Sequence, residues 1–178
     1  MKKGASKSKG SSFEREIAKF LTKWVSGQVK ELYYWRSPSS GAVATLNVGS
    51  KEISGDIIAI KQEGTFFTDK FSIELKTGYP KINFNQHLKD NKNFEIENFW
   101  KQCLRDAERA HKYPMLIYRK LGFPVILGID EIVREKILYS VRLPKRLVLC
   151  FENGIPDVNF YDMESFFKIV TPEVIKKI

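Results

Sequence analysis

The chain has 178 residues, of which 43% are hydrophobic and 29% charged, so wholesale disorder and a collagen-like fibre are excluded. Its 30 Lys and Arg residues outnumber its 21 Asp and Glu residues, and the net charge of +9 favours a polyanionic partner, nucleic acid before an anionic membrane surface. No stretch approaches the roughly 18–20 apolar residues that cross a membrane. We expect one domain with an appended segment, in a cytoplasmic protein that associates with the nucleoid when it acts.

The first third of the chain predicts a basic arm, a helix and a strand. Residues 1–10 contain four lysines, so we expect a flexible arm, either a solvated terminus or a phosphate-contacting tail. A helix is predicted to begin near Ser11. Its apolar residues share one face: Phe13, Ile17, Phe20, Leu21 and Trp24. Residues 31–36 are rich in aromatics and predict a strand, and residues 37–52 predict a long loop.

The remaining segments predict a mixed α/β fold. Strands are expected at 56–61 and 71–77 with a hairpin-like connection between them, followed by a helix over 95–112 and strands at 114–120 and 123–129. Beyond residue 130 we expect a strand near 147–152 and short helices near 162–168 and 172–177. The order helix, strand, strand, strand, helix, strand predicts helices packed around a central sheet.

Several motifs with known chemistry are missing from the sequence. It contains no G-x-x-x-x-G-K-[ST] phosphate loop, no G-x-G-x-x-G after a strand, no H-E-x-x-H and no G-x-S-x-G. The sequence contains only two cysteines and two histidines, which argues against a disulfide framework and against a histidine-rich metal site. The chemistry must therefore be sought among carboxylates.

Three residues form the strongest candidate site. Asp56 begins one predicted strand, and Glu74 and Lys76 lie two apart in the next, so both project from the same face. If the two strands pair as a hairpin, Asp56 approaches Glu74. Two carboxylates beside a lysine offer hard oxygen ligands for Mg²⁺, which would activate a water against a scissile phosphate, with Lys76 orienting or deprotonating that water. The alternative is a solvated face of an edge strand.

The same residues carry a resemblance to a known superfamily. Residues 54–56 (Ser-Gly-Asp) and 73–76 (Ile-Glu-Leu-Lys) resemble the motif of the PD-(D/E)-x-K nucleases, with Gly55 in the place of the proline. Residues 9–16 (Lys-Gly-Ser-Ser-Phe-Glu-Arg-Glu) are similar to the K-G-x-x-x-E-R-E opening of archaeal-type Holliday-junction resolvases, and so is the pair at 36–37. The resemblance covers residues 9–130 and implies a restriction-endonuclease-like αβββαβ core, with a mixed central sheet flanked by helices.

The resemblance also implies roles for single residues. Asp56, Glu74, Glu14 and the backbone carbonyl of Leu75 would hold Mg²⁺, for which Mn²⁺ would substitute, and Lys76 would serve the nucleophile. The enzymes it resembles act as homodimers on branched DNA such as the four-way junction. For Glu14 a second interpretation stays open, because Ser11-x-x-Glu14 also fits a capping box that merely starts a helix.

Basic and polar residues near these motifs are candidate DNA contacts, because guanidinium and hydroxyl groups bind phosphate well. They are Arg15, Arg36, Ser37, Ser39, Ser40, Lys101, Arg105 and Arg109. Gln102 is a possible accessory residue that points from the second helix toward the site. The alternative for the charged members is a solvated helix face.

We expect a flexible arm over 1–10, a nuclease core over 11–130 and a C-terminal extension over 131–178 packed on the core. The predicted function is a Mg²⁺-dependent endonuclease, most like a Holliday-junction resolvase, with DNA as partner, a homodimer as the assembly and no membrane. Two alternatives remain open: a restriction-like or repair endonuclease that cuts duplex DNA, and a non-catalytic DNA-binding module on a nuclease scaffold.

Overall fold

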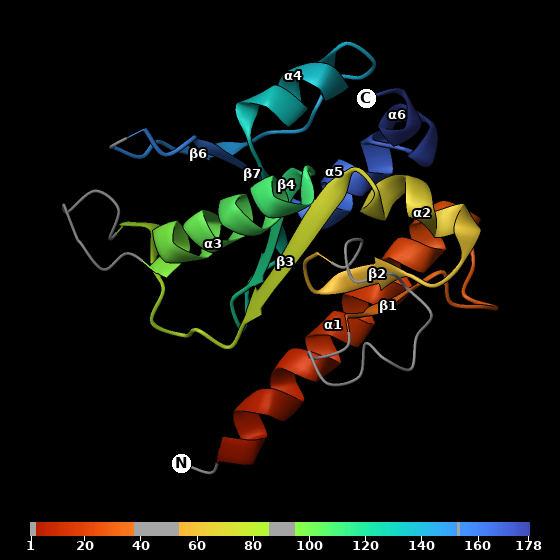
Figure 1. Cartoon of the computed structure of the whole chain (residues 1–178). Coiled ribbons are helices and arrows are strands. Elements are labelled where there is room, and N and C mark those ends of the chain that lie inside the picture. The colour runs from red at the N-terminus through yellow and green to blue at the C-terminus, as the bar shows by residue number, and fades with distance from the viewer. Residues whose placement is uncertain (1–2, 38–53, 86–94, 153) are drawn as a thin grey trace.

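The structure, a computed structural model, describes residues 3–37, 54–85, 95–152 and 154–178 (Figure 1). In chain order these residues form α1 (Lys3–Ser26), β1 (Tyr34–Arg36), β2 (Ile57–Ala59), α2 (Gln62–Thr68), β3 (Phe71–Thr77), α3 (Glu95–Ala110), β4 (Tyr113–Arg119), β5 (Ile126–Ile129), α4 (Glu131–Leu138), β6 (Leu147–Leu149), β7 (Val158–Asp162), α5 (Met163–Ile169) and α6 (Pro172–Lys177). The predicted α/β, restriction-endonuclease-like fold is confirmed, with α2 inserted between the second and third strands.

The central sheet is mixed. Within the described residues it has five strands in the order β3-β4-β5-β7-β6, in which β3 and β4 are parallel and the other neighbours antiparallel. β1 and β2 pair antiparallel beside it, and residue 55 joins this pair to β3 through a single parallel bridge with residue 73. β3 therefore occupies the position between the small ribbon and the main sheet.

The expected hairpin between residues 56 and 77 is wrong. The connection forms α2, and the bridge that links its two ends is parallel, because a helix lets the chain cross over and return in the same direction. The sequence did not predict this helix because the segment contains Gly64, and glycine is unfavourable in helix interiors. The structure needs the glycine, because a Cβ there would lie 3.0 Å from the ring of Tyr34.

Helices cover both faces of the sheet. The larger core lies between the sheet and α1, α4, α5 and α6, and includes Ile73, Leu75, Met115 and Ile117 from the strands. The smaller core lies under α3 and includes Trp100. Because side chains alternate along a strand, β3 sends its apolar residues toward α1 and the intervening residues toward α3. The polar face of β3 is thus the face that α3 covers.

Two further expectations about element boundaries differ from the structure. Residues 3–10, expected as a flexible arm, belong to α1, which begins at Lys3 instead of near Ser11. Their glycines and serines are weak helix formers, but extension of a helix already anchored by packing needs one hydrogen bond per added residue and no new nucleus. Ser11 consequently lies inside the helix, and a capping box at Ser11 and Glu14 is excluded.

The last third of the chain completes the sheet. β7 pairs with β5, so a strand from beyond residue 130 lies between two other strands of the sheet. The Lys70 ammonium, just before β3, donates to the carbonyls of Ile175 and Lys176 at 3.0 and 3.1 Å, which fastens α6 to the core. β7 and α4 were not predicted. In the part of the chain that the structure describes, no helix is long and apolar enough to cross a membrane.

Candidate active site

Asp56 stands at the entrance to β2, after a glycine that brings the backbone against β3. Gly55 has a φ of 77° and a Cβ at this residue would lie 2.5 Å from the Ile73 carbonyl oxygen. Proline fixes φ at about −65° and cannot adopt this conformation. Glycine in the place of the motif's proline is therefore a requirement of this backbone, and it holds Asp56 close to β3.

The Asp56 carboxylate is held by the neighbouring main chain. Its Oδ2 accepts the Leu75 backbone N–H at 2.8 Å. The Asp56 N–H donates to the Ile73 carbonyl at 2.7 Å, and the Ser37 N–H donates to the Asp56 carbonyl at 2.7 Å. The predicted approach of Asp56 to β3 is thus present, through a parallel bridge in place of a hairpin. The end of β1 that carries Ser37 also lies beside it.

Glu74, Lys76 and Gln102 form a closed set of contacts on the α3 face of the sheet. The Lys76 ammonium lies 2.5 Å from Glu74 Oε1 and donates to Gln102 Oε1 at 3.0 Å. The Gln102 amide nitrogen donates to the same Glu74 oxygen at 3.0 Å. The Glu74 side chain is only 7% exposed and that of Lys76 16% exposed. A solvated strand face is therefore excluded for this pair, and Gln102 does point from α3 toward it.

The two carboxyl groups are electrostatically unfavourable neighbours. Burial raises the pKa of Asp56, the Leu75 hydrogen bond opposes that rise, and the charge of Glu14 adds to it. Burial also raises the pKa of Glu74, followed by the charge of Asp56, while Lys76 lowers it. Among the described residues one ammonium group, that of Lys76, lies beside these two buried carboxyl groups, so a further positive charge would stabilise their ionised forms.

The structure separates Glu14 from Glu16, which helical projection left on opposite flanks of the apolar stripe. Glu14 lies 3.8 Å from the Arg36 guanidinium, and its charge is felt by Asp56. Glu16 instead pairs with Arg119 at the end of β4, at 2.5 Å. Glu14 and Arg36 are therefore on the Asp56 side of the molecule, as expected for site residues.

Asp106 was missed as a site residue. It lies one turn after Gln102 on α3, and its charge raises the pKa of both Asp56 and Glu74. It also pairs with Arg109 at 3.8 Å. The signal was available in the sequence, because residues four apart share a helix face and Gln102 was already expected to point at the site.

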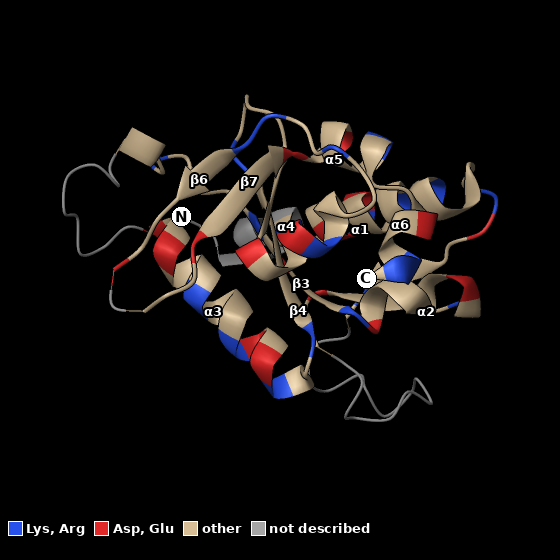
Figure 2. Cartoon of the chain, turned by 90° about the horizontal axis from the view of Figure 1, so that it is seen from above, with Lys and Arg blue, Asp and Glu red and all other residues tan. Residues whose placement is uncertain are grey.

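The candidate DNA contacts have different surroundings. Arg15, Arg105 and Arg109 are exposed, and Lys101 is paired with Glu97 at 2.6 Å on the same helix. Figure 2 shows acidic and basic residues interspersed along α3. Ser39 and Ser40 lie outside the described residues. Contact of any of these residues with DNA stays a prediction.

The donor set fits a divalent cation that keeps part of its water shell. Among the described residues no group of three or more His, Cys, Asp or Glu side chains could hold a metal ion on its own. Mg²⁺, however, is commonly bound through one or two carboxylates with waters completing its octahedron. Asp56 and Glu74 supply two such carboxylates. Burial first, and nearby acidic charges second, raise the pKa of each, and a bound cation would stabilise their ionised forms.

An aspartate at a strand entrance, held against a Glu-x-Lys strand of a mixed sheet between helices, is the arrangement of the PD-(D/E)xK nuclease superfamily. Comparison with protein families agrees: the model described as "Phage putative PDDEXK endonuclease" matches residues 5–146, and the chain belongs to this family of nucleases. The matched range contains Glu14, Asp56, Glu74 and Lys76. No curated protein and no solved structure matches the chain.

Proposed function

We propose that the protein is a Mg²⁺-dependent, structure-selective DNA endonuclease, most like a Holliday-junction resolvase. One observation carries the proposal: two buried carboxyl groups, each with a raised pKa, stand beside a lysine on adjoining strands. The residues at 9–16 and 36–37 that resemble the resolvases add Glu14 and Arg36, which the fold brings to the same side.

In this proposal Asp56, Glu74 and the Leu75 carbonyl hold the ion, and Glu14 binds it directly or through water. The ion supplies a more acidic water and stabilises negative charge on the scissile phosphate. The Lys76 ammonium would orient that water by donating a hydrogen bond to it, and the proton of the water would leave to bulk solvent. Gln102 holds the Lys76 ammonium at 3.0 Å and so fixes its direction. Mn²⁺ substitutes for Mg²⁺, since both accept oxygen ligands in an octahedron.

A four-way junction is resolved by two coordinated nicks, so we propose a homodimer with a two-fold axis and two such sites. The excess of positive charge supports a polyanionic substrate, because it favours association with the DNA backbone. Arg15, Arg36, Lys101, Arg105 and Arg109 are the phosphate contacts of this proposal, with Ser37, Ser39 and Ser40 in the connection after β1.

Cleavage of matched DNAs tests the proposal. A four-way junction and its linear duplex arm are incubated with the protein in Mg²⁺ and in EDTA, alongside Asp56→Asn and an exposed control, Asp69→Asn. We expect paired symmetric nicks in the junction, in Mg²⁺ only, with wild type and Asp69→Asn but not with Asp56→Asn. Equal cutting of duplex and junction would replace the resolvase by a duplex endonuclease. Binding without cutting would indicate the non-catalytic module.

A further inference from the structure

The connection between β4 and β5 exposes two large apolar side chains. Leu121 is 88% exposed and Phe123 61% exposed. They flank Gly122 at the tip of the connection. Single apolar residues on a surface need no explanation, but two at one protruding tip form a feature that a partner can use.

The tip is a rigid turn. The Phe123 N–H donates to the Lys120 carbonyl at 3.1 Å, and Gly122 has a φ of 81°, which is the geometry of a type II turn with glycine in its third position. The Lys120 ammonium donates to the Ile82 carbonyl at 2.7 Å and lies 5.0 Å from the Phe123 ring. Pro124 follows and fixes the exit of the chain. The two side chains are thus presented in a defined conformation.

The tip follows β4, the strand that pairs with the site strand β3. Lys76 is opposite Tyr118 in the parallel register of β3 and β4. Leu121 comes five residues after Leu116, which pairs with Glu74. At a rise of roughly 3.3 Å per residue it is at most about 16 Å beyond Glu74 along the strands, the length of roughly five nucleotides. In Figure 1 this is also the side toward which the N-terminal half of α1 extends.

The charge around the tip selects its occupant. Lys120 lies within the tip, 5.0 Å from the Phe123 ring, in a chain of net charge +9, whereas Arg119 before it is paired with Glu16. An apolar tip beside a lysine suits a strand whose phosphate contacts the ammonium and whose bases offer flat apolar faces. Leu and Phe are side chains that proteins insert between base steps, and aromatic rings stack on bases of any sequence.

We propose that Leu121 and Phe123 form a wedge that enters DNA at a branch point and stacks on the bases that are unpaired or loosely stacked there. The inference rests on the proposed function and deepens it, because it assigns the choice of branched over linear DNA to this tip. A continuous duplex resists entry, since its base steps must first be unstacked. A branch offers open steps and so places the scissile phosphate up to about five nucleotides away, at Asp56 and Glu74.

Binding in EDTA tests the wedge without metal-dependent cutting. Wild type, Leu121→Ser/Phe123→Ser and Phe123→Trp are titrated against a four-way junction and its linear arm, with 2-aminopurine at the branch to report unstacking. The control, Ile132→Ser/Tyr139→Ser, removes two apolar side chains of 61% and 92% exposure in and after α4. Since all these side chains are exposed, the folded state is expected to survive each change.

We expect the double serine variant to bind the junction about tenfold more weakly, to bind duplex within about twofold of wild type and to lose the rise in 2-aminopurine fluorescence. Phe123→Trp and the α4 control keep the junction preference. An unchanged preference, or an equal loss on both DNAs, would overturn the wedge. So would a shift from dimer to monomer in ultracentrifugation of the double variant without DNA, because the tip would then be an interface between copies.

Cleavage in Mg²⁺, run in parallel, separates this inference from the proposed function. If wild type cuts DNA while the tip variant retains its junction preference, the wedge fails and the nuclease stands. If wild type cuts neither DNA while its preference for junctions depends on the tip, the nuclease fails and the wedge stands.

Discussion

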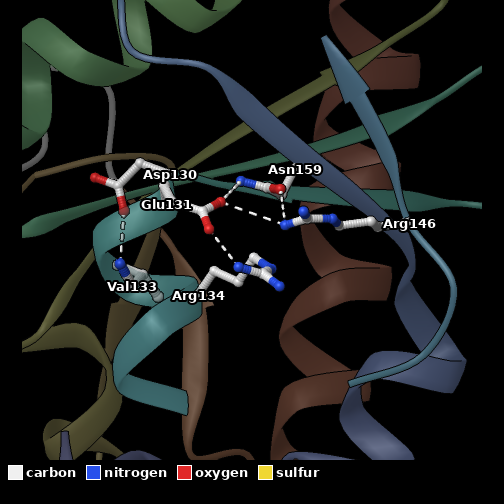
Figure 3. A network of polar contacts seen from close by, with 6 residues as sticks. All are labelled: Asp130, Glu131, Val133, Arg134, Arg146 and Asn159. Carbon is white, nitrogen blue, oxygen red and sulfur yellow. Dashed lines mark hydrogen bonds and ion pairs between the residues drawn. The ribbon is translucent and has the colours of Figure 1, made fainter. Parts of the chain in front are cut away.

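Two clusters of acidic and basic side chains lie at different parts of the sheet, and they differ in how their charges are matched. At the edge strand β3, two buried carboxyl groups share one ammonium, and the pKa of each is raised. Around α4, β6 and β7, the Glu131 carboxylate is paired with the guanidinium groups of Arg134 and Arg146 (Figure 3). The first cluster is short of positive charge, and the second is balanced.

Hydrogen bonding in the balanced cluster is closely matched. The fully buried Asn159 donates to Glu131 at 3.0 Å and accepts from Arg146 at 2.6 Å, and Asp130 caps α4 by accepting the Val133 N–H at 2.8 Å. Such a network joins α4, β6 and β7 and stabilises the fold. Acidic residues alone therefore do not mark a site, and neither does a single buried acid: burial raises the pKa of Asp130, yet its carboxylate caps a helix. At β3, by contrast, two buried carboxyl groups lie close to one another beside one ammonium group.

The largest expected effect is on catalysis. Lys76→Ala removes the ammonium that contacts Glu74, and we expect cleavage to fall by about a thousandfold or more, the scale of a lost group that acts in the transition state. The control is Lys61→Ala, which breaks an ion pair of the same 2.5 Å length on the exposed surface, between Lys61 and Glu31. Initial cleavage rates decide, and comparable rates in the two variants would remove Lys76 from the mechanism.

Gly55→Ala should disturb both folding and activity. The new Cβ would meet the Ile73 carbonyl and the backbone would keep a φ of 77°, so we expect a loss of about 3 kcal/mol in the free energy of unfolding and displacement of Asp56. Gly27→Ala separates the two causes, because Gly27 has a φ of 73° with nothing near its Cβ. It should lose only about 1 kcal/mol and no activity. Equal losses in urea titrations would contradict the close approach at Gly55.

Asn159→Leu should affect stability alone. It keeps the number and branching of the side-chain heavy atoms but withdraws two hydrogen bonds from Glu131 and Arg146, so we expect a loss of about 2 kcal/mol and a fall in Tm of roughly 4–8 °C. At temperatures where the variant is folded, its cleavage rate should equal that of wild type. A reduced rate there would mean that the balanced cluster takes part in the chemistry.

The smallest effect is a gain in stability at the site itself. Because burial raises the pKa of Asp56, the folded protein binds this proton more tightly than the unfolded chain, and stability falls as the pH rises through the raised pKa. Asparagine removes that charge and can still accept the Leu75 N–H. We expect metal-free Asp56→Asn to melt roughly 2–4 °C above wild type at pH 7. The difference should vanish below a pH of about 4, where both forms are neutral.

The sequence was sufficient where local rules decide. Strand alternation placed Glu74 and Lys76 on one face, and helical periodicity gave the apolar face of α1. The ion-pair partners of Glu14 and Glu16 could not be predicted from the sequence, because both glutamates flank the apolar stripe of the helix. Only the tertiary structure shows that Glu14 lies near Arg36 and that Glu16 pairs with Arg119.

Short elements were harder to predict. α2 contains too few residues for a helical period, and its glycine argues against a helix. Asn159 and Asp162 interrupt the apolar pattern of β7, so the sequence did not predict this strand. The burial of Asn159 is explained by its side-chain hydrogen bonds, which only the folded structure shows. The sequence placed Asp56 beside β3 on the assumption that residues 56–77 form a hairpin. Asp56 does lie beside β3, but α2 connects β2 to β3 and makes the bridge between them parallel.

The most direct test of the unbalanced pair counts bound metal. Mn²⁺ binding is measured by electron paramagnetic resonance without DNA, in wild type, Asp56→Asn, Glu74→Gln and Asn159→Leu. We predict about tenfold or weaker binding in the first two variants, since each withdraws a carboxylate ligand, and wild-type binding in Asn159→Leu. Unchanged Mn²⁺ affinity in Asp56→Asn and Glu74→Gln would contradict the account, because the unmatched charge would then serve no metal.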